Sequence, residues 1–241
     1  MTTRHTISVG RQRFRVGPWQ ADEGIAHLGV TPHGPRVTAE EVRACVEQLL
    51  DGGFHSVLTS ALDTAEAATF LEVGFAEHDR LRVLSHDLSG LDRLPDPPSG
   101  LRLRRGRRGD RPPALQVDQR AFPAFWRLDA TGLAEAESAT PSSRFRVAVD
   151  AGRVVGYAVT GRGGQQGFLQ RLATDPARWR AGIGSALVVD ALRWCARRHC
   201  RQAFVNTQVD NGTALALYDR LGFRATTNDL VVLLWSRTTA G

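Results

Sequence analysis

The sequence has 241 residues, of which 42% are hydrophobic and 23% charged, a composition typical of a globular protein with one or two domains. No stretch reaches about 18 consecutive apolar residues, which excludes a membrane-spanning helix, and residues 1–10 show no secretory signal pattern. All 31 basic residues are arginine, and the formal net charge is only +6. The composition therefore predicts a cytoplasmic protein without a membrane partner.

The three cysteines, Cys45, Cys195 and Cys200, show no spacing typical of a structural site. Their number is odd, which argues against a disulfide framework, and they lack C-x-x-C pairs, which argues against a zinc site. We therefore expect no metal.

The first part of the chain, residues 1–88, is predicted to form a smaller α/β domain. A helix is expected at 38–50, and an apolar segment follows from Val57. The stretch 89–100 is rich in proline and glycine and predicts a linker, because proline interrupts regular backbone pairing. We therefore expect a second, larger domain at 101–241.

A dense run of arginines opens the larger domain, between Arg102 and Arg111. One interpretation is a phosphate-binding surface. The other is an edge strand and turn over 101–110, in which Leu101 and Leu103 alternate towards the interior. The second is favoured, because no aromatic residues interleave for base stacking, and a nucleic-acid partner is therefore not expected.

The rest of the larger domain alternates between helix and strand patterns. Helices are expected at 112–122, where Asp110 can cap the first turn, and at 131–139, 183–199 and 213–221. Strands are expected at 145–149, 154–160, 167–174, 203–207 and 231–235. The order β-α-α-β-β-β-α-β-α-β predicts a mixed α/β fold, with one mixed sheet covered by helices.

A glycine-rich motif, D-P-A-R-W-R-A-G-I-G-S at 175–185, lies between a predicted strand and a long helix. Gly182 and Gly184 permit a sharp turn that directs backbone N–H groups outward at the positive end of the helix dipole. This geometry suits a diphosphate. Arg178 and Arg180 can add charge-assisted hydrogen bonds. The alternative is a glycine-rich turn that serves close packing.

A second motif, N-G-T-A-L-A-L-Y-D-R-L-G-F at 211–223, belongs to the next helix. Leu217, Tyr218 and Leu221 follow helical spacing, which by itself predicts an amphipathic helix with Tyr218 in the core. A buried tyrosine nevertheless usually has a partner for its hydroxyl. The order and spacing of the two motifs are more specific than either motif alone.

In these motifs the chain resembles the GNAT superfamily of N-acetyltransferases, over about 101–241. The family pattern is Q/R-x-x-G-x-G/A, a strand, and N-x-x-A-x-x-L-Y-x-x-L-G-F. The second motif is complete here, whereas Trp179 stands at the leading Q/R position of the first. The resemblance implies the GNAT fold, a mixed and mostly antiparallel sheet splayed between its fourth and fifth strands, with flanking helices. It also implies acetyl-CoA as cosubstrate.

The resemblance further implies a set of cofactor-binding residues. The backbone that would pair with the pantetheine arm belongs to Leu172, Ala173 and Thr174. The pyrophosphate would be held by Arg180, Ala181, Gly182, Ile183, Gly184 and Ser185. The far side would be lined by Asn211 and Ala214. Tyr218 would lie near the sulfur and give its proton to the departing thiolate.

The acceptor is expected to be a primary amine, on a small molecule or a peptide N-terminus, that attacks the thioester directly. Asn206 stands where ribosomal-protein alanine acetyltransferases carry a glutamate, and it cannot act as a base. Without a strong base, the site favours an amine of low pKa, such as an α-amine at about 7.8. A water relay to Asp129, Glu135 or Glu137 is the alternative, although each can equally be a surface carboxylate.

The family builds its acceptor wall near the first two helices of the domain. In this sequence that region contains Phe122, Phe125 and Trp126, followed by Asp129. The aromatic group is either a core plug between helix and sheet or an apolar wall for the acceptor. Phe125, Trp126 and Asp129 are the candidates for substrate contacts.

The N-terminal domain contains a possible degenerate copy of the second motif. Shifted by 148 positions, Asp63 falls on Asn211 and Phe70 falls on Tyr218. Pro35, ahead of the helix at 38–50, removes a backbone donor that a phosphate loop would use. A GNAT-like half-domain of this kind would be catalytically silent.

These observations leave two hypotheses of different classes. The first is a cytoplasmic acetyl-CoA-dependent N-acetyltransferase, a monomer or homodimer. The second is a non-catalytic regulatory module that binds acyl-CoA, which is suggested by Trp179, by Asn206 and by the silent copy. Turnover that depends on the Tyr218 proton would support the first hypothesis. CoA binding without thiol release would support the second.

Overall fold

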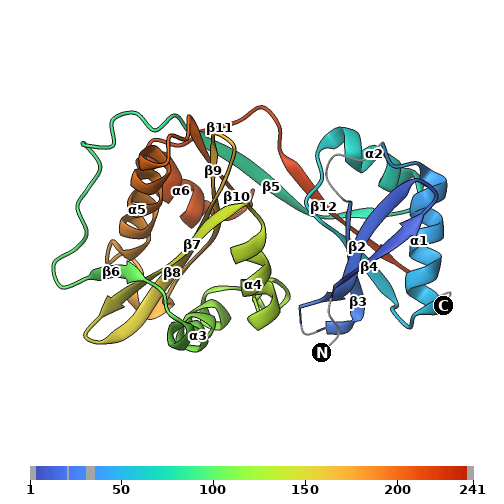
Figure 1. The fold of residues 1–241 in the computed structure, drawn as a ribbon, viewed down its shortest axis with the longest axis horizontal. Coiled ribbons are helices and arrows are strands. Elements are labelled where there is room, and N and C mark those ends of the chain that lie inside the picture. The colour runs from blue at the N-terminus through green and yellow to red at the C-terminus, as the bar shows by residue number, and fades with distance from the viewer. Residues whose placement is uncertain (1–3, 21, 31–35, 238–241) are drawn as a thin grey trace. The chain divides into compact units, whose positions relative to one another are not determined.

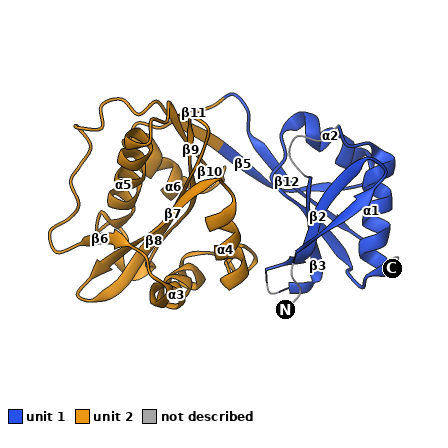
Figure 2. Ribbon diagram, viewed as in Figure 1, with its two compact units in different colours: residues 1–82, 227–241 blue, residues 83–226 orange. Residues whose placement is uncertain are grey.

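The structure is a computed structural model that describes residues 4–20, 22–30 and 36–237. The chain divides into two compact units (Figures 1 and 2): unit 1 is Met1–Arg82 with Thr227–Gly241, and unit 2 is Val83–Thr226. This division differs from the expected boundary at 89–100. The chain passes into unit 2 within one long strand, so the Pro/Gly-rich stretch belongs to unit 2 and does not separate the units.

Unit 1 combines segments from both ends of the chain. Its elements are β1 (His5–Val9), β2 (Gln12–Trp19), β3 (Asp22–Val30), α1 (Ala39–Asp51), β4 (Ser56–Thr59), α2 (Thr64–Glu72), the first part of β5 (Ala76–His86) and β12 (Leu230–Ser236). The strand order is β1-β2-β3-β4-β12-β5. Core residues of the sheet, such as Phe14 and Leu28, pack with Val42 and Leu49 of α1 and with Phe70 of α2.

Strand β12 corrects the expectation that the last strand completes the larger domain. It pairs antiparallel with β4, with Leu234 opposite Leu58, and with β5, with Leu230 opposite Leu81. The physical reason is that the apolar run 231–235 fits any buried sheet position, and its partners are far away in the sequence. The local pattern therefore predicts the strand but not the sheet to which it belongs.

Unit 2 carries the two motifs. Its strands are the second part of β5, β6 (Arg102–Arg105), β7 (Ser142–Asp150), β8 (Arg153–Gly163), β9 (Gln166–Thr174), β10 (Gln202–Gln208) and β11 (Arg224–Ala225). Its α-helices are α3 (Arg111–Ala121), α4 (Ala130–Ser138), α5 (Ile183–Arg197) and α6 (Gly212–Arg220). Short 3₁₀ helices occupy η1 (Arg108–Asp110), η2 (Ala124–Trp126) and η3 (Pro176–Arg178). The strand order is β5-β10-β9-β8-β7-β6, and β11 pairs with β5.

Helices cover both faces of the unit 2 sheet. Helix α5 packs its apolar face, including Leu187 and Leu192, on one side of β8 and β9. Helices α3 and α4 bury Val117 and Leu133 on the other side. Gly156 of β8 permits the close approach of α5, because a Cβ there would lie 3.0 Å from Ile183 Cγ2. The mixed sheet with flanking helices confirms the fold class that the sequence predicts.

The splay implied by the resemblance lies between β9 and β10. These parallel strands pair only where they begin, from Gln202 opposite Gln166 to Phe204 opposite Phe168. No further pairing joins them in the described chain. The register of β9 against β8 shifts at the same level, between Val159 and Thr160, which makes Gln170 the extra residue of a β-bulge. The two strands therefore part where β9 bends.

The basic run forms an edge strand, which confirms the interpretation favoured above. Strand β6 lies at the end of the sheet and pairs antiparallel with β7. Asp110 does not cap α3 through its side chain as expected. Instead its carboxylate receives two hydrogen bonds from the Arg104 guanidinium, both 2.6 Å, and one from the Arg107 N–H at 2.7 Å. Arg104 is thereby the first cause that lowers the pKa of Asp110 to about 2.

Candidate functional site

The N-terminus of α5 has the backbone geometry that the glycine motif predicts. Gly182 occupies the N-cap position with φ 74° and Arg180 has φ 63°, both in the left-handed region. No side chain caps the helix, and Ala186 is bonded through its N–H to the Gly182 carbonyl at 2.9 Å. The N–H groups of the first turn therefore point towards the loop at the positive end of the helix dipole. An anion such as a pyrophosphate suits this position.

The arginines of the loop differ in availability. Arg178 forms an ion pair with Asp150 at the β7–β8 turn, so its charge is already matched. Arg120 of α3 pairs with Asp175 at 2.7 Å and ties the loop to that helix. In the described chain Arg180 has no ion-pair partner. Of the two arginines expected to reach a phosphate, Arg180 is thus the one that is free to do so.

Trp179 replaces the leading Q/R of the motif and makes a backbone contact. Its indole Nε1 donates to the carbonyl of Thr174 at 3.2 Å, and the side chain remains 54% exposed. The indole therefore lies back over the end of β9 and cannot donate to a phosphate through the same N–H.

The backbone of β9 shows which of its groups face the gap towards β10. The Asp175 N–H donates to the Val155 carbonyl at 2.9 Å, and Thr174 lies opposite Gly156. In an antiparallel ladder this bond makes Thr174 a non-hydrogen-bonded position, so its own N–H and C=O point away from β8. By alternation Leu172 also faces the gap, whereas Ala173 faces β8. Two of the three residues expected to contact pantetheine therefore present backbone groups to the gap, and Ala173 does not.

The second motif folds as α6, and its asparagine has a structural role. Asn211 is the N-cap residue, and its side chain accepts from the Ala214 N–H at 3.1 Å. This contact fixes the start of α6 beside the end of β10. The polar groups of Asn211 and Ala214 are thus partly used within the helix cap.

Tyr218 lies in the core at 4% exposure, with its ring 5.4 Å from that of Phe223. Its hydroxyl has no hydrogen-bond partner among the described residues. Burial raises the pKa of Tyr218 above the ordinary tyrosine value, so the hydroxyl keeps its proton at neutral pH. A protonated hydroxyl without a protein partner can donate to a substrate atom.

Two of the three carboxylates considered as proton relays have structural partners. Asp129 caps α4 by accepting from the Gly132 N–H at 2.7 Å, and Glu137 pairs with Arg111 at 2.5 Å. Glu135 is half-buried on the same helix. Asn206 is exposed on β10. Helix capping and ion pairing account for Asp129 and Glu137, so neither is a free base in this arrangement.

The aromatic group of 122–126 divides between core and surface. Phe122 packs against the core beneath α3, and the Arg171 guanidinium lies 3.5 Å from its ring centroid. Phe125 and Trp126 are half-buried and meet edge to face, with centroids 5.0 Å apart. The core plug thus describes Phe122, whereas Phe125 and Trp126 retain exposed surface.

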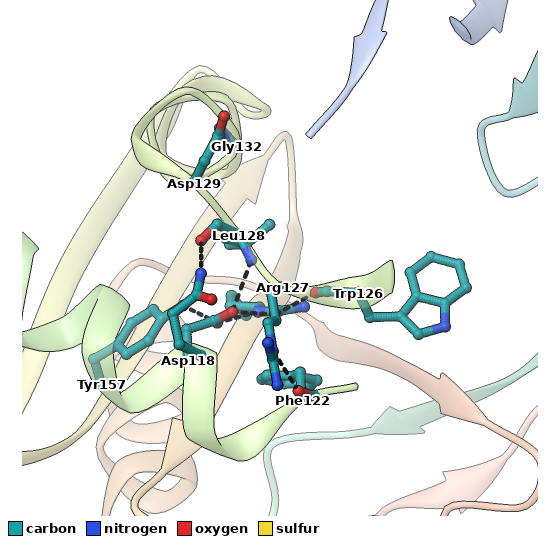
Figure 3. Close-up of polar contacts among 10 residues, drawn as sticks. Asp118, Phe122, Trp126, Arg127, Leu128, Asp129, Gly132 and Tyr157 are labelled. Atoms are coloured by element: carbon teal, nitrogen blue, oxygen red, sulfur yellow. Dashed lines mark hydrogen bonds and ion pairs between the residues drawn. The ribbon is translucent and has the colours of Figure 1, made fainter. Parts of the chain in front are cut away.

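A buried polar network, which the sequence reasoning missed, anchors this segment (Figure 3). Asp118 of α3 is fully buried. Its carboxylate accepts from Arg171 Nε at 2.8 Å and Nη2 at 2.7 Å, from the Tyr157 hydroxyl at 2.5 Å and from the Leu128 N–H at 2.8 Å. Arg171 Nη2 also donates to the Trp126 carbonyl at 2.8 Å. The available signal was a carboxylate on the apolar face of α3, next to Val117.

The described residues contain no candidate metal-binding cluster and no helix that could span a membrane. Among residues 4–20, 22–30 and 36–237, no three His, Cys, Asp or Glu side chains are grouped so that they could hold a metal ion. In the same ranges, no helix combines the length and apolar character needed to cross a membrane.

Comparison with known proteins agrees with the motifs. Residues 112–223 match the family model of the acetyltransferase (GNAT) family. The mycothiol acetyltransferase of Actinosynnema mirum is 31% identical over 213 residues, covering 83% of this chain and 71% of that protein. The mycothiol acetyltransferase of Amycolatopsis mediterranei is 29% identical over 236 residues, covering 83% of this chain and 76% of that protein.

Solved structures show the same fold. A GCN5-related N-acetyltransferase from Sphaerobacter thermophilus superposes with a TM-score of 0.67 at 18% identity, covering 94% of this chain and 76% of that one. A tandem GNAT protein from the clavulanic acid biosynthesis pathway gives 0.65 at 15% identity, covering 93% and 78%. With the splayed sheet, the open helix start and the relatives together, the chain belongs to the GNAT acetyltransferase family and is an N-acetyltransferase.

Proposed function

We propose that this N-acetyltransferase uses acetyl-CoA as donor and a primary amine of low pKa as acceptor. The observation that carries the proposal is the uncapped start of α5 beside the gap-facing backbone of Leu172 and Thr174. Pyrophosphate would bind the N–H groups of Gly182 to Ser185, with Arg180 adding charge. The pantetheine arm would then extend along β9, in the gap that β10 leaves open.

Tyr218 is the proposed general acid. The amine nitrogen attacks the thioester carbonyl carbon, the C–N bond forms and the carbonyl oxygen gains negative charge. A backbone N–H of β9 facing the gap would stabilise that oxygen. The C–S bond then breaks, the thiolate takes the proton of the Tyr218 hydroxyl, and the amine loses its proton to solvent. Tyr218 regains a proton from water before the next turnover.

The acceptor side would be formed by Phe125, Trp126 and the start of α4 at Asp129. Because Asp129 caps α4 and Glu137 pairs with Arg111, we propose that the amine arrives largely deprotonated. An amine with a pKa of about 7.8 meets this condition at neutral pH far better than a lysine at about 10.4. The named relatives are mycothiol acetyltransferases, which favours a small polar amine as acceptor over a protein lysine.

The test is thiol release from acetyl-CoA against a panel of amines, with CoA binding followed by calorimetry in parallel. The panel contains amino sugars, amino acid amides and peptides with free N-termini, each with its N-acetylated form as matched control. Turnover with one class, and none with the acetylated controls, supports the proposal. CoA binding without turnover on any amine would contradict it.

A further inference from the structure

The buried network of Asp118, Arg171 and Tyr157 joins two parts of the site. Arg171 lies on β9, directly before gap-facing Leu172, where the β-bulge bends the strand. Asp118 lies on α3, just before the chain leaves this helix towards 122–129. A carboxylate that is fully buried is costly unless it is paired and fully hydrogen-bonded, and here four donor groups satisfy it.

The same network holds the backbone of the acceptor-side segment at two points. Asp118 receives the Leu128 N–H, and Arg171 donates to the Trp126 carbonyl. Two further bonds reinforce the segment, from Arg127 Nε to the Phe122 carbonyl at 3.0 Å and from Gln119 to the Leu128 carbonyl at 3.1 Å. The Trp126 side chain points away from Asp118 (Figure 3). The network therefore fixes the backbone of the segment and leaves its aromatic side chain outside.

The position of the bulge explains why this link matters for chemistry. Helix α5 covers one face of β9, so an amine has to reach the gap from the face that carries α3 and the segment 122–129. Arg171 sits on that face, at the level where β9 and β10 part. A shift of the segment of about 1 Å would misplace an acceptor relative to the thioester, and such displacements can reduce rates by about 100-fold.

We propose that Arg171, held in place by Asp118 and Tyr157, is a positioning residue that sets the acceptor-side segment 122–129 against the cofactor strand β9. This inference rests on the proposed function, since it assigns the segment to acceptor binding. Arg171 does not itself contact either substrate. It acts through the Trp126 carbonyl and the Asp118 carboxylate.

The decisive variant is Arg171→Lys, which keeps the positive charge and loses the forked contact with Asp118 and Trp126. The matched control is Arg146→Lys, which alters another half-buried forked pair of unit 2, with Asp190. We expect the KM for the acceptor to rise about 10- to 100-fold in Arg171→Lys, with the Kd for CoA within twofold of the original protein. Arg146→Lys should change neither constant. Tyr157→Phe removes one bond and should give a smaller rise in the same KM.

A second readout does not depend on turnover. Hydrogen exchange of the backbone amides in 122–129 should become at least tenfold faster in Arg171→Lys, while exchange in α5 stays unchanged. An unchanged acceptor KM with unchanged exchange in the segment would overturn the proposal, as would equal effects in Arg146→Lys. If the original protein turns over no amine, the proposed function fails. The exchange experiment still decides whether Arg171 orders the segment.

Discussion

The two units contain the same succession of elements around one parallel strand pair, with opposite results. In unit 2, β9-α5-β10-α6 leaves the strands paired only at their beginning. In unit 1, β3-α1-β4-α2 pairs the strands along all of β4, from Ile25 opposite Ser56 to Leu28 opposite Thr59, and the Ser60 N–H continues to the Leu28 carbonyl at 2.9 Å. A closed strand pair offers no free backbone to a pantetheine arm. The difference shows that the order of elements alone does not leave strand backbone free for a ligand.

The N-termini of α1 and α5 also differ, because side chains cap α1 and no side chain caps α5. Helix α1 begins with a capping box, in which Thr38 accepts from the Glu41 N–H at 3.2 Å and Glu41 accepts from the Thr38 N–H at 3.0 Å. These side chains occupy the donors and place a negative charge at the helix start. Helix α5 begins with glycine and no such cap. Pro35, which would remove a backbone donor from a phosphate loop ahead of α1, lies outside the described residues.

The aromatic pairs of the two units are closely matched. Phe70 meets Phe75 edge to face with centroids 5.3 Å apart, and Tyr218 meets Phe223 at 5.4 Å. Both pairs have the same sequence spacing, so the aligned positions share one packing role. The hydroxyl is the difference. We propose on these grounds that unit 1 is a silent relative of unit 2, as the sequence comparison predicts.

The largest expected effect, on kcat, comes from replacing Tyr218 by phenylalanine, the residue at the aligned position 70 of unit 1. Tyr218→Phe should lower kcat about 100- to 10,000-fold, the range for loss of a positioned general acid, with CoA binding retained. The reciprocal Phe70→Tyr in the same background should restore nothing, because β3 and β4 are closed. Stopped-flow thiol detection measures both. Wild-type kcat in Tyr218→Phe would remove Tyr218 from the mechanism.

The pH dependence of the reaction rate is an independent test of the role of Tyr218. Because burial raises the pKa of Tyr218, the acid stays protonated throughout the neutral and mildly alkaline range. The rate at subsaturating amine should therefore rise with pH as the acceptor deprotonates, without a falling limb below about pH 10, the ordinary tyrosine pKa. A falling limb near pH 8 would show that another group donates the proton.

The next largest effect, on CoA binding, is expected when α5 receives an acidic residue in its first turn, as α1 has. Ser185→Glu places a carboxylate at the position that Glu41 holds in α1, three residues after the N-cap. CoA binding should weaken about 100-fold, or about 2.7 kcal/mol, because the carboxylate repels pyrophosphate and competes for its donors. Thermal stability should stay equal or rise, since acidic residues suit helix starts. Ser185→Gln is the neutral control, and calorimetry with CoA is the measurement; equal affinity in both variants would contradict an anion site here.

Acid should destabilise unit 1 more strongly than unit 2 as the pH falls below 6.5. Burial, together with Arg4 and Arg15, lowers the pKa of His27 from 6.5 to about 3. Below pH 6.5 the unfolded chain therefore binds a proton that the folded unit does not bind. The free energy of unfolding is thus highest above pH 6.5 and falls as the pH drops towards 3. The loss should be on the order of 2 kcal/mol by pH 5. In unit 2, burial also lowers the pKa of His86, but by less than that of His27. Asp110 of unit 2, with its pKa at about 2, loses its contribution only below its ordinary value of 3.8.

Hydrogen exchange at pH 7.5 and pH 5 resolves this order. Amides of β3 and β4 should lose protection first, and His27→Gln should remove the pH dependence of unit 1 while leaving that of unit 2. Earlier loss of protection in β7 and β8 would show that His27 does not control the acid response.

The smallest effect concerns Trp179. Trp179→Gln restores the residue type of the family pattern and frees the Thr174 carbonyl. CoA affinity should improve about 3- to 10-fold, the worth of one or two hydrogen bonds. Trp179→Ala frees the carbonyl without adding an amide, so it separates the two contributions. Weaker CoA binding in both variants would instead show that the indole itself supports the cofactor.

Sequence alone predicted those parts of the candidate site that depend on local backbone geometry. The glycine turn at Gly182 and Gly184 and the motif 211–223 around α6 are turns and spacings that a short stretch of sequence contains. The contact between Asp118 and Arg171 joins residues 53 positions apart, and the sequence around each residue does not indicate its partner. Asp110 shows a different failure, since capping and pairing with Arg104 compete for one carboxylate. Only the folded arrangement decides between them.

The placement of β12 between β4 and β5 has a consequence for biosynthesis. Unit 1 contains the first 82 residues and the last 15, and unit 2 is the stretch between them. While the ribosome is still synthesising the chain, the sheet of unit 1 lacks a central strand until 230–236 emerge, although all residues of unit 2 are already available. Unit 2 can therefore mature first, and unit 1, although its residues come earlier in the sequence, is the last to close.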